Sequence, residues 1–168
     1  MRFADRPAVE VDVHVDAPPE RLWPLVVDID LPAQFSSELQ GAEWLPGASD
    51  PGPAVGASFR GRNTHPARGG WETVSVVTAC EEPRLFAWAV GDPATPSASW
   101  AFELTPEPGG TRLRQRAELG PGPSGLTRII ESMPDKEELI IARRLEEHQT
   151  NMKATLEGMK ALAEGDPG

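Results

Sequence analysis

His148 is the side chain of this sequence best suited to acid–base chemistry. The segment from Pro134 to Ala163 has the apolar periodicity of one long amphipathic helix. Its apolar stripe consists of Ile141, Leu145, Met152, Leu156, Met159 and Ala163, with His148 just inside the edge. A neutral imidazole can accept a proton from one ligand group and donate a proton to another. We therefore expect His148 either to face a cavity as a candidate catalytic residue, or to lie at the stripe's margin, bonded to a backbone carbonyl or partly solvated.

Glu72 is the second candidate for acid–base catalysis. It follows Trp71 and shares one face of a predicted strand with Val74 and Val76. If that face is buried, the pKa of the carboxyl group rises and the group becomes a usable general acid or base. If the face is exposed, Glu72 pairs with an arginine on a neighbouring strand. The sequence alone does not choose between the two faces.

Two amide side chains are candidates for orienting a ligand. Gln115 lies between Leu113 and Ala117 on one strand face, so it is either a buried amide that needs hydrogen-bond partners or a polar residue near the strand's exposed end. Asn63 shares a face with Phe59 and Gly61. It either presents its amide to the same space or bonds the backbone of the turn that follows.

The walls of such a cavity are predicted to be aromatic on the sheet and aliphatic on the helix. The candidate wall residues are Trp88, Trp100, Phe102, Met152, Leu156 and Met159. Each of them could instead be ordinary core. Arg144, near the edge of the helical stripe, could guard the mouth of the cavity or simply be solvated or ion-paired.

Several kinds of site are excluded by what the sequence lacks. The three histidines are well separated and Cys80 is the single cysteine, so no metal site is predicted. No glycine-rich phosphate loop opens a helix, and no serine stands in a nucleophile motif. We therefore expect no cofactor. The absence of tyrosine excludes acid chemistry by a phenol.

The elements that must position these residues form an α+β pattern. Val9–Val15 alternates as a half-buried strand, and two short helices are expected after it, one entered through Pro18 and Pro19 and one over Leu31–Ser37. Six further strands are then predicted at 41–46, 57–64, 71–80, 84–90, 97–105 and 111–119, with a loop at 47–56. The long helix follows the last strand.

Length and charge limit the class of protein. The 168 residues predict a single domain over 1–168 with a core of about 9–163. The formal net charge of −10 argues against a nucleic acid or an anionic membrane surface as partner. The lone cysteine and the absence of an apolar run of membrane-spanning or signal-peptide length predict a cytoplasmic protein without stable membrane insertion. We expect a monomer or a homodimer.

The sequence also resembles a known superfamily. The segments AlaProProGluArgLeuTrpProLeuValValAsp at 17–28, GlyTrpGluThrValSer at 70–75 and SerTrpAlaPheGluLeuThrPro at 99–106 are similar to the START-like or SRPBCC superfamily, in particular its bacterial polyketide cyclase/dehydrase-like branch. This resemblance implies a helix-grip fold: a curved, seven-stranded antiparallel sheet wrapped around the C-terminal helix, with two short helices after the first strand. It also implies a tunnel for small apolar or amphipathic molecules.

The resemblance does not fix one function, because members of this superfamily range from ligand carriers to enzymes. The favoured prediction is binding of a small hydrophobic or aromatic molecule in the internal cavity. The first alternative is a cyclase, dehydratase or isomerase that acts on a polyketide-like or other carbonyl-containing substrate. The second alternative is a protein-interaction module.

Overall fold

One antiparallel sheet of seven strands dominates the structure, a computed structural model that describes residues 1–47 and 52–165. The strand order is β1-β7-β6-β5-β4-β3-β2. The strands are β1 (Ala8–Val15), β2 (Leu39–Trp44), β3 (Ser58–His65), β4 (Gly69–Glu81), β5 (Leu85–Val90), β6 (Ala98–Glu107) and β7 (Gly110–Leu119). From β2 to β7 each strand pairs with the next in the chain, and β1 closes the other edge by pairing with β7. Of the loop predicted at 47–56, residues 48–51 lie outside the described residues.

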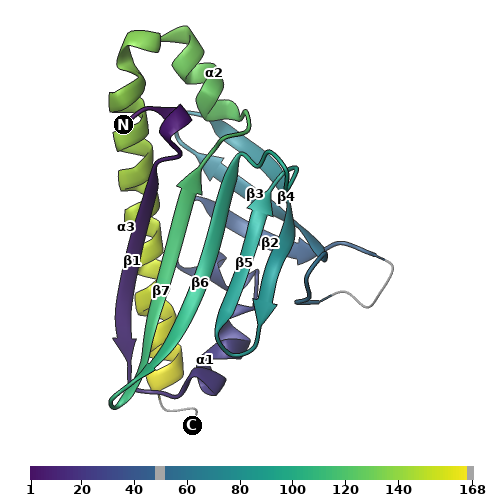
Figure 1. Cartoon of the computed structure of the whole chain (residues 1–168), viewed down its shortest axis with the longest axis vertical. Coiled ribbons are helices and arrows are strands. Elements are labelled where there is room, and N and C mark those ends of the chain that lie inside the picture. Colours follow the sequence, from purple (N-terminus) through teal and green to yellow (C-terminus); the bar gives the residue numbers. More distant parts are fainter. Residues whose placement is uncertain (48–51, 166–168) are drawn as a thin grey trace.

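The helices cover one face of this sheet. They are α1 (Pro19–Val26), α2 (Gly125–Ser132) and α3 (Glu137–Glu164), with short 3-10 segments η1 (Phe3–Asp5), η2 (Leu31–Gln34) and η3 (Pro134–Lys136). Figure 1 shows α3 running the length of the molecule beside β1, with α1 near its C-terminal end and α2 beside its N-terminal end. This is the predicted helix-grip architecture, including the two short helical segments between β1 and β2.

The core lies between α3 and the concave face of the sheet. Met152, Leu156 and Met159 of α3 belong to one buried cluster with Leu113 of β7 and Leu22 of α1. A second, smaller cluster of Leu119, Leu126, Ile130 and Ile141 joins α2 to α3 and to the end of β7. The apolar stripe predicted for the last helix is therefore the face that the sheet covers.

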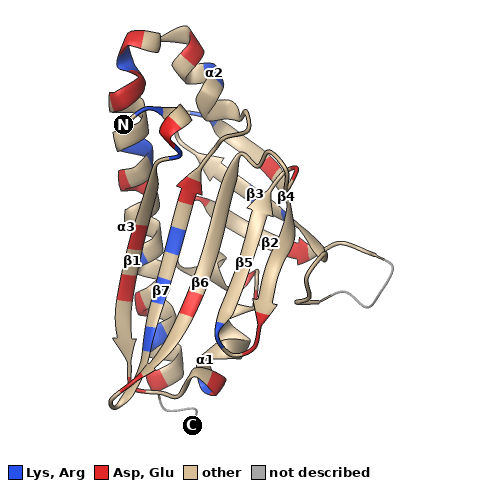
Figure 2. Cartoon of the chain, viewed as in Figure 1, with Lys and Arg blue, Asp and Glu red and all other residues tan. Residues whose placement is uncertain are grey.

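The outer face of the sheet at β1, β7 and β6 carries charges of alternating sign (Figure 2). Arg112 pairs with Asp12 at 3.1 Å, and Arg114 pairs with Glu10 at 3.3 Å. These side chains are roughly half exposed, so each pair adds little stability. The arginines of β7 therefore face away from the core.

None of the helices within residues 1–47 and 52–165 combines the length and the apolar character that crossing a bilayer requires.

Candidate functional site

A cavity of about 160 Å³ lies between the sheet and α3. Its sheet side is aromatic and consists of Phe59, Phe86, Trp88, Trp100 and Phe102. The indoles of Trp88 and Trp100 are stacked, with ring centres 6.2 Å apart and an angle of 8° between the planes. Because β5 and β6 pair Trp88 with Trp100 directly, the register of the sheet fixes this flat aromatic surface.

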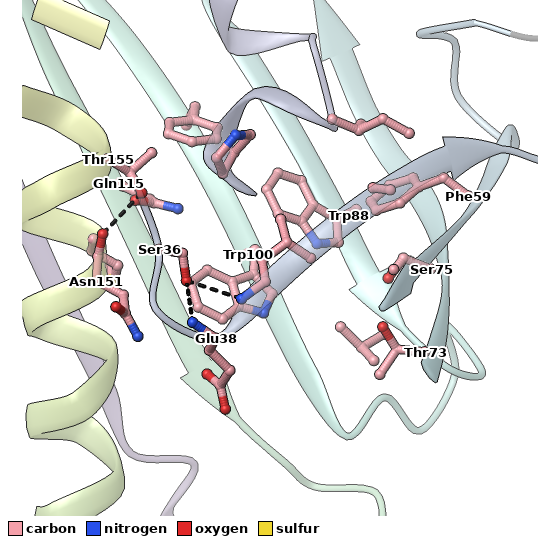
Figure 3. Close-up of a pocket in the computed structure, with 18 of the residues that line it drawn as sticks. Ser36, Glu38, Phe59, Thr73, Ser75, Trp88, Trp100, Gln115, Asn151 and Thr155 are labelled. Atoms are coloured by element: carbon pink, nitrogen blue, oxygen red, sulfur yellow. Dashed lines mark hydrogen bonds between the residues drawn. The ribbon is translucent and has the colours of Figure 1, made fainter. Parts of the chain in front are cut away.

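The helix contributes the polar side of the cavity. His148, Asn151, Met152 and Thr155 line it from successive turns of α3. Figure 3 shows Asn151 and Thr155 across the cavity from the two tryptophans. The Thr155 hydroxyl donates to the Asn151 carbonyl at 2.8 Å, so the turn of helix that carries both residues is held internally.

His148 is buried and neutral. Its ring meets Trp100 edge-on, with centroids 4.9 Å apart and an interplanar angle of 82°. Burial, reinforced by the positive charge of Arg144, lowers the pKa of His148 to about 3. Within the described residues the imidazole makes no hydrogen bond. The neutral ring therefore keeps one N–H donor and one nitrogen acceptor without a partner in the described structure.

Gln115 is a second polar group of the cavity that lacks a hydrogen-bond partner among the described residues. It lies on β7 between Val11 of β1 and Phe102 of β6, and only 6% of it is exposed. Its Oε1 is buried without a hydrogen-bond partner in the described structure. A buried unpaired carbonyl destabilises the folded state, so this oxygen is a candidate acceptor for a ligand donor.

The segment between α1 and β2 closes the cavity. Asp28, Ile29, Pro32, Ser36, Glu38 and Leu39 line it. The Ser36 hydroxyl accepts hydrogen bonds from the backbone N–H groups of Glu38 and Leu39, at 3.0 and 3.1 Å. The Ser37 backbone and hydroxyl both donate to Asn151 Oδ1 at 3.1 Å, which ties this segment to α3.

A wider opening of about 560 Å³, which we call the vestibule, adjoins the cavity. The two share His148, Trp100 and Glu38 among their lining residues. The charged residues of the vestibule are Glu38, Arg68, Glu72, Arg128 and Arg144. Glu38 accepts from Arg144 at 2.8 Å and from Arg68 at 3.3 Å, and these three side chains are largely buried. Arg144 thus lies at the mouth of the cavity, paired with a carboxylate.

The structure brings most of the predicted site residues to the cavity wall. The residues that line it are Asn63, Trp88, Trp100, Phe102, Gln115, His148 and Met152. Leu156 and Met159, predicted as wall residues, do not line it. They are 1% and 0% exposed and are packed in the core, because the cavity extends along α3 only as far as Thr155.

The prediction that Glu72 is a buried acid or base is wrong. Its side chain is 60% exposed, and its carboxylate lies 4.0 Å from the Arg60 guanidinium of β3, which is the exposed alternative. The opposite face of β4 turns inward, so Thr73 and Ser75 line the cavity instead. Trp71–Cys80 carries apolar residues on both faces, and their alternation therefore could not identify the buried face.

No group of three or more His, Cys, Asp or Glu side chains in the described residues could hold a metal ion.

Comparisons with known proteins agree with this geometry. A model of the family described as polyketide cyclase/dehydrase and lipid transport matches residues 6–164. The chain belongs to this family. The predicted resemblance to the SRPBCC superfamily is confirmed, and membership supports a ligand-binding or polyketide cyclase-like protein. None of the curated proteins matches the sequence significantly.

Solved structures show the same fold. A Polyketide_cyc-like protein from Corynebacterium glutamicum is 30% identical, with a TM-score of 0.64 over 92% of this chain and 90% of its own. The di-domain ARO/CYC protein BexL from the BE-7585A biosynthetic pathway is 18% identical, with a TM-score of 0.71 over 96% of this chain. This chain corresponds to 51% of BexL. Ara h 8.0201 is 15% identical, with a TM-score of 0.57 over 91% of this chain and 97% of its own.

Proposed function

We propose that this member of the family binds a small aromatic molecule that carries a hydrogen-bond donor such as a hydroxyl group. The observation that supports this most directly is Gln115, which lines an aromatic-walled cavity and whose buried Oε1 has no partner in the described residues. Ligand sites are typically apolar concavities with a few such polar groups, which fix the orientation of the ligand.

The volume of the cavity limits the size of the group that enters it. At about 160 Å³ it is comparable with an engineered cavity of about 150 Å³ that holds benzene. One aromatic ring with a short substituent therefore fits between the stacked tryptophans and α3. A larger ligand would extend into the vestibule.

The electrostatics of His148 favour binding over proton transfer. A general base works best when its pKa lies near the working pH, and burial lowers the pKa of His148 to about 3. Its imidazole is a weak base at neutral pH but a good hydrogen-bonding group. We therefore assign His148 to ligand orientation, beside Gln115 and Asn63.

Calorimetric titration with two matched probes tests the proposal. Para-ethylphenol carries a hydroxyl donor, and para-ethylanisole has the same ring with the donor methylated. We expect the phenol to bind about tenfold more tightly, because only the phenol satisfies the Gln115 oxygen. If neither probe binds, and neither shifts the amide NMR signals of Gln115 and His148, the proposal is wrong.

A second candidate function is ring closure or dehydration of a carbonyl-containing substrate. The family description and the likeness to the fold of the ARO/CYC protein BexL favour it. In that case the neutral imidazole N–H of His148 would donate to the substrate carbonyl instead of removing a proton. Turnover of such a substrate that falls by orders of magnitude in His148→Phe, with substrate affinity retained, would support this candidate over simple binding.

A further inference from the structure

Arg68 lines the vestibule and is stacked on an aromatic ring. It lies in the turn between β3 and β4, and its guanidinium carbon is 4.7 Å from the centre of the Trp71 ring. Only 21% of its side chain is exposed. Stacking on an indole restricts the plane of the guanidinium group, so little conformational entropy is lost when that group binds an anion.

Most of the donors of this guanidinium group are unused. Arg68 Nη2 donates to Glu38 Oε1 at 3.3 Å. Its Nε and Nη1 groups make no hydrogen bond within the described residues. A guanidinium has five N–H donors in a planar fork, which matches the two oxygens of a carboxylate or phosphate.

The charge of the vestibule is also incompletely balanced. Arg68 and Arg144 share the same oxygen of Glu38. Glu72 points to Arg60, and Arg128 is exposed with no ion pair among the described residues. The second carboxylate on Arg144 is Glu147, which also pairs with His65 at 2.7 Å. Three arginines thus line one opening in a chain of net charge −10.

The electrostatic environment of the arginines is consistent with this imbalance. Burial and the nearby Arg144 lower the pKa of Arg68. Both arginines also contribute to the lowered pKa of His148. The charged residues that line the vestibule are three arginines and two glutamates, and an anionic group would offset this excess of positive charge.

We propose that the ligand is an aromatic acid whose ring occupies the cavity and whose anionic group binds the free donors of Arg68 in the vestibule. This inference rests on the proposed function, since it concerns the same ligand. It narrows the ligand class from aromatic molecules with a hydrogen-bond donor to those that also carry an anionic group. Arg144, fixed by two carboxylates, contributes positive charge.

A homologous series of probes tests this inference. Para-hydroxybenzoate, para-hydroxyphenylacetate and para-hydroxyphenylpropanoate place the acid progressively farther from the ring. Each is compared with its neutral primary amide by calorimetric titration. We expect at least one acid to bind about tenfold more tightly than its amide, because hydrogen bonds to charged groups are the stronger ones.

Arg68→Gln is expected to remove the preference for the acid and to leave the affinity for the amide within about twofold. Arg68→Lys keeps the positive charge but lacks the planar guanidinium group that binds two oxygens at once. It should therefore retain only part of the preference for the acid over the amide. Arg84→Gln is the matched control, because Arg84 is exposed and its ion pair within the described residues is with Glu81, at the turn before β5. Thermal unfolding verifies that each variant is folded.

The outcomes separate this inference from the proposed function. Equal binding of acids and amides overturns the inference and leaves the proposed function standing. A preference for the acid that survives in Arg68→Gln also overturns it, because the anion then binds elsewhere. If no acid and no amide binds, this inference fails, and the titration with para-ethylphenol decides separately whether the proposed function stands.

Discussion

The ring of Phe35 lies directly against the backbone of Gly158, in the space that a side chain at position 158 would occupy. Phe35 follows η2, and Gly158 lies in α3, so this contact sets how closely the segment between α1 and β2 approaches the helix. The same segment carries Ser36 and Glu38 to the cavity. A glycine in the middle of a helix therefore has a packing role that outweighs its poor helix propensity.

Gly158→Ala is expected to destabilise the protein by about 1–3 kcal/mol, because the new methyl group must displace Phe35. Without the contact to Phe35, replacing glycine with alanine would stabilise the helix by about 1 kcal/mol. A destabilising effect would therefore show that this contact outweighs helix propensity. Urea unfolding measures it. Gly125→Ala is the control, since a Cβ there meets no atom within 4 Å. Stabilisation by Gly158→Ala would show that Phe35 is free to move.

Gly61→Leu is expected to abolish binding of para-ethylphenol by filling the cavity. Gly61 lines the cavity from β3, and a Cβ there would lie 3.3 Å from Thr73 Oγ1, so the longer side chain must extend into the open space. The neighbouring Arg60 lies on the opposite face, beside Glu72. Arg60→Leu should therefore bind the probe normally in the same calorimetric titration. Equal affinities of the two variants would place the ligand elsewhere.

Gln115→Leu is expected to stabilise the protein and weaken its binding. Removing a buried unpaired acceptor should raise the free energy of unfolding by about 1–3 kcal/mol. The preference for para-ethylphenol over para-ethylanisole should disappear, because the acceptor for the hydroxyl is gone. Urea unfolding and titration of the same sample test both effects. A loss of stability would mean that Gln115 is satisfied in the folded protein.

His148→Phe is expected to make the protein relatively more stable as the pH falls. The folded pKa is about 3 and the unfolded pKa about 6.5, so between these values the unfolded wild-type chain binds the extra proton. Acidification therefore destabilises the wild type through this residue by up to about 1.4 kcal/mol per pH unit. Phenylalanine retains a ring against Trp100 and does not titrate. The difference in unfolding free energy, variant minus wild type, should be more positive at about pH 5.5 than at about pH 7.5. An equal difference at the two pH values would contradict a buried neutral imidazole.

Glu107→Gln tests the opposite shift at His14. Hydrogen bonds with Glu107 and then Asp16 raise the pKa of His14. The resulting stabilisation is fully present at pH values below the pKa that His14 has in the unfolded chain. It is lost as the pH rises through the higher pKa that His14 has in the folded protein. The variant should therefore be more destabilised at about pH 6 than at about pH 9. Loss of the pair between Glu107 and Arg112 is the same at both values and cancels in the comparison.

The fold could be predicted because alternation and helical period are local signals. Val9–Val15 alternates, and β1 occupies Ala8–Val15. The stripe from Ile141 to Ala163 is the buried face of α3. These patterns identify a face wherever one side of an element is apolar and the other polar.

The site was predicted less completely because a cavity is a property of several elements together. Leu156 and Met159 share the stripe with His148, but packing against the core starts just beyond Thr155. A short helix is predicted over Leu31–Ser37, but nothing in the sequence places residues 28–39 against the cavity. The pairing of Glu38 with Arg68 and Arg144 joins three distant segments, which no local pattern connects.

The fluorescence of the two stacked tryptophans provides an intrinsic signal for ligand binding. Trp88 and Trp100 both line the cavity, and Trp100 also touches His148, so any compound that enters must change the surroundings of at least one indole. Tryptophan emission from the unlabelled native chain can therefore register occupancy directly. A library of several hundred metabolites could be screened in this way before a single substrate is known.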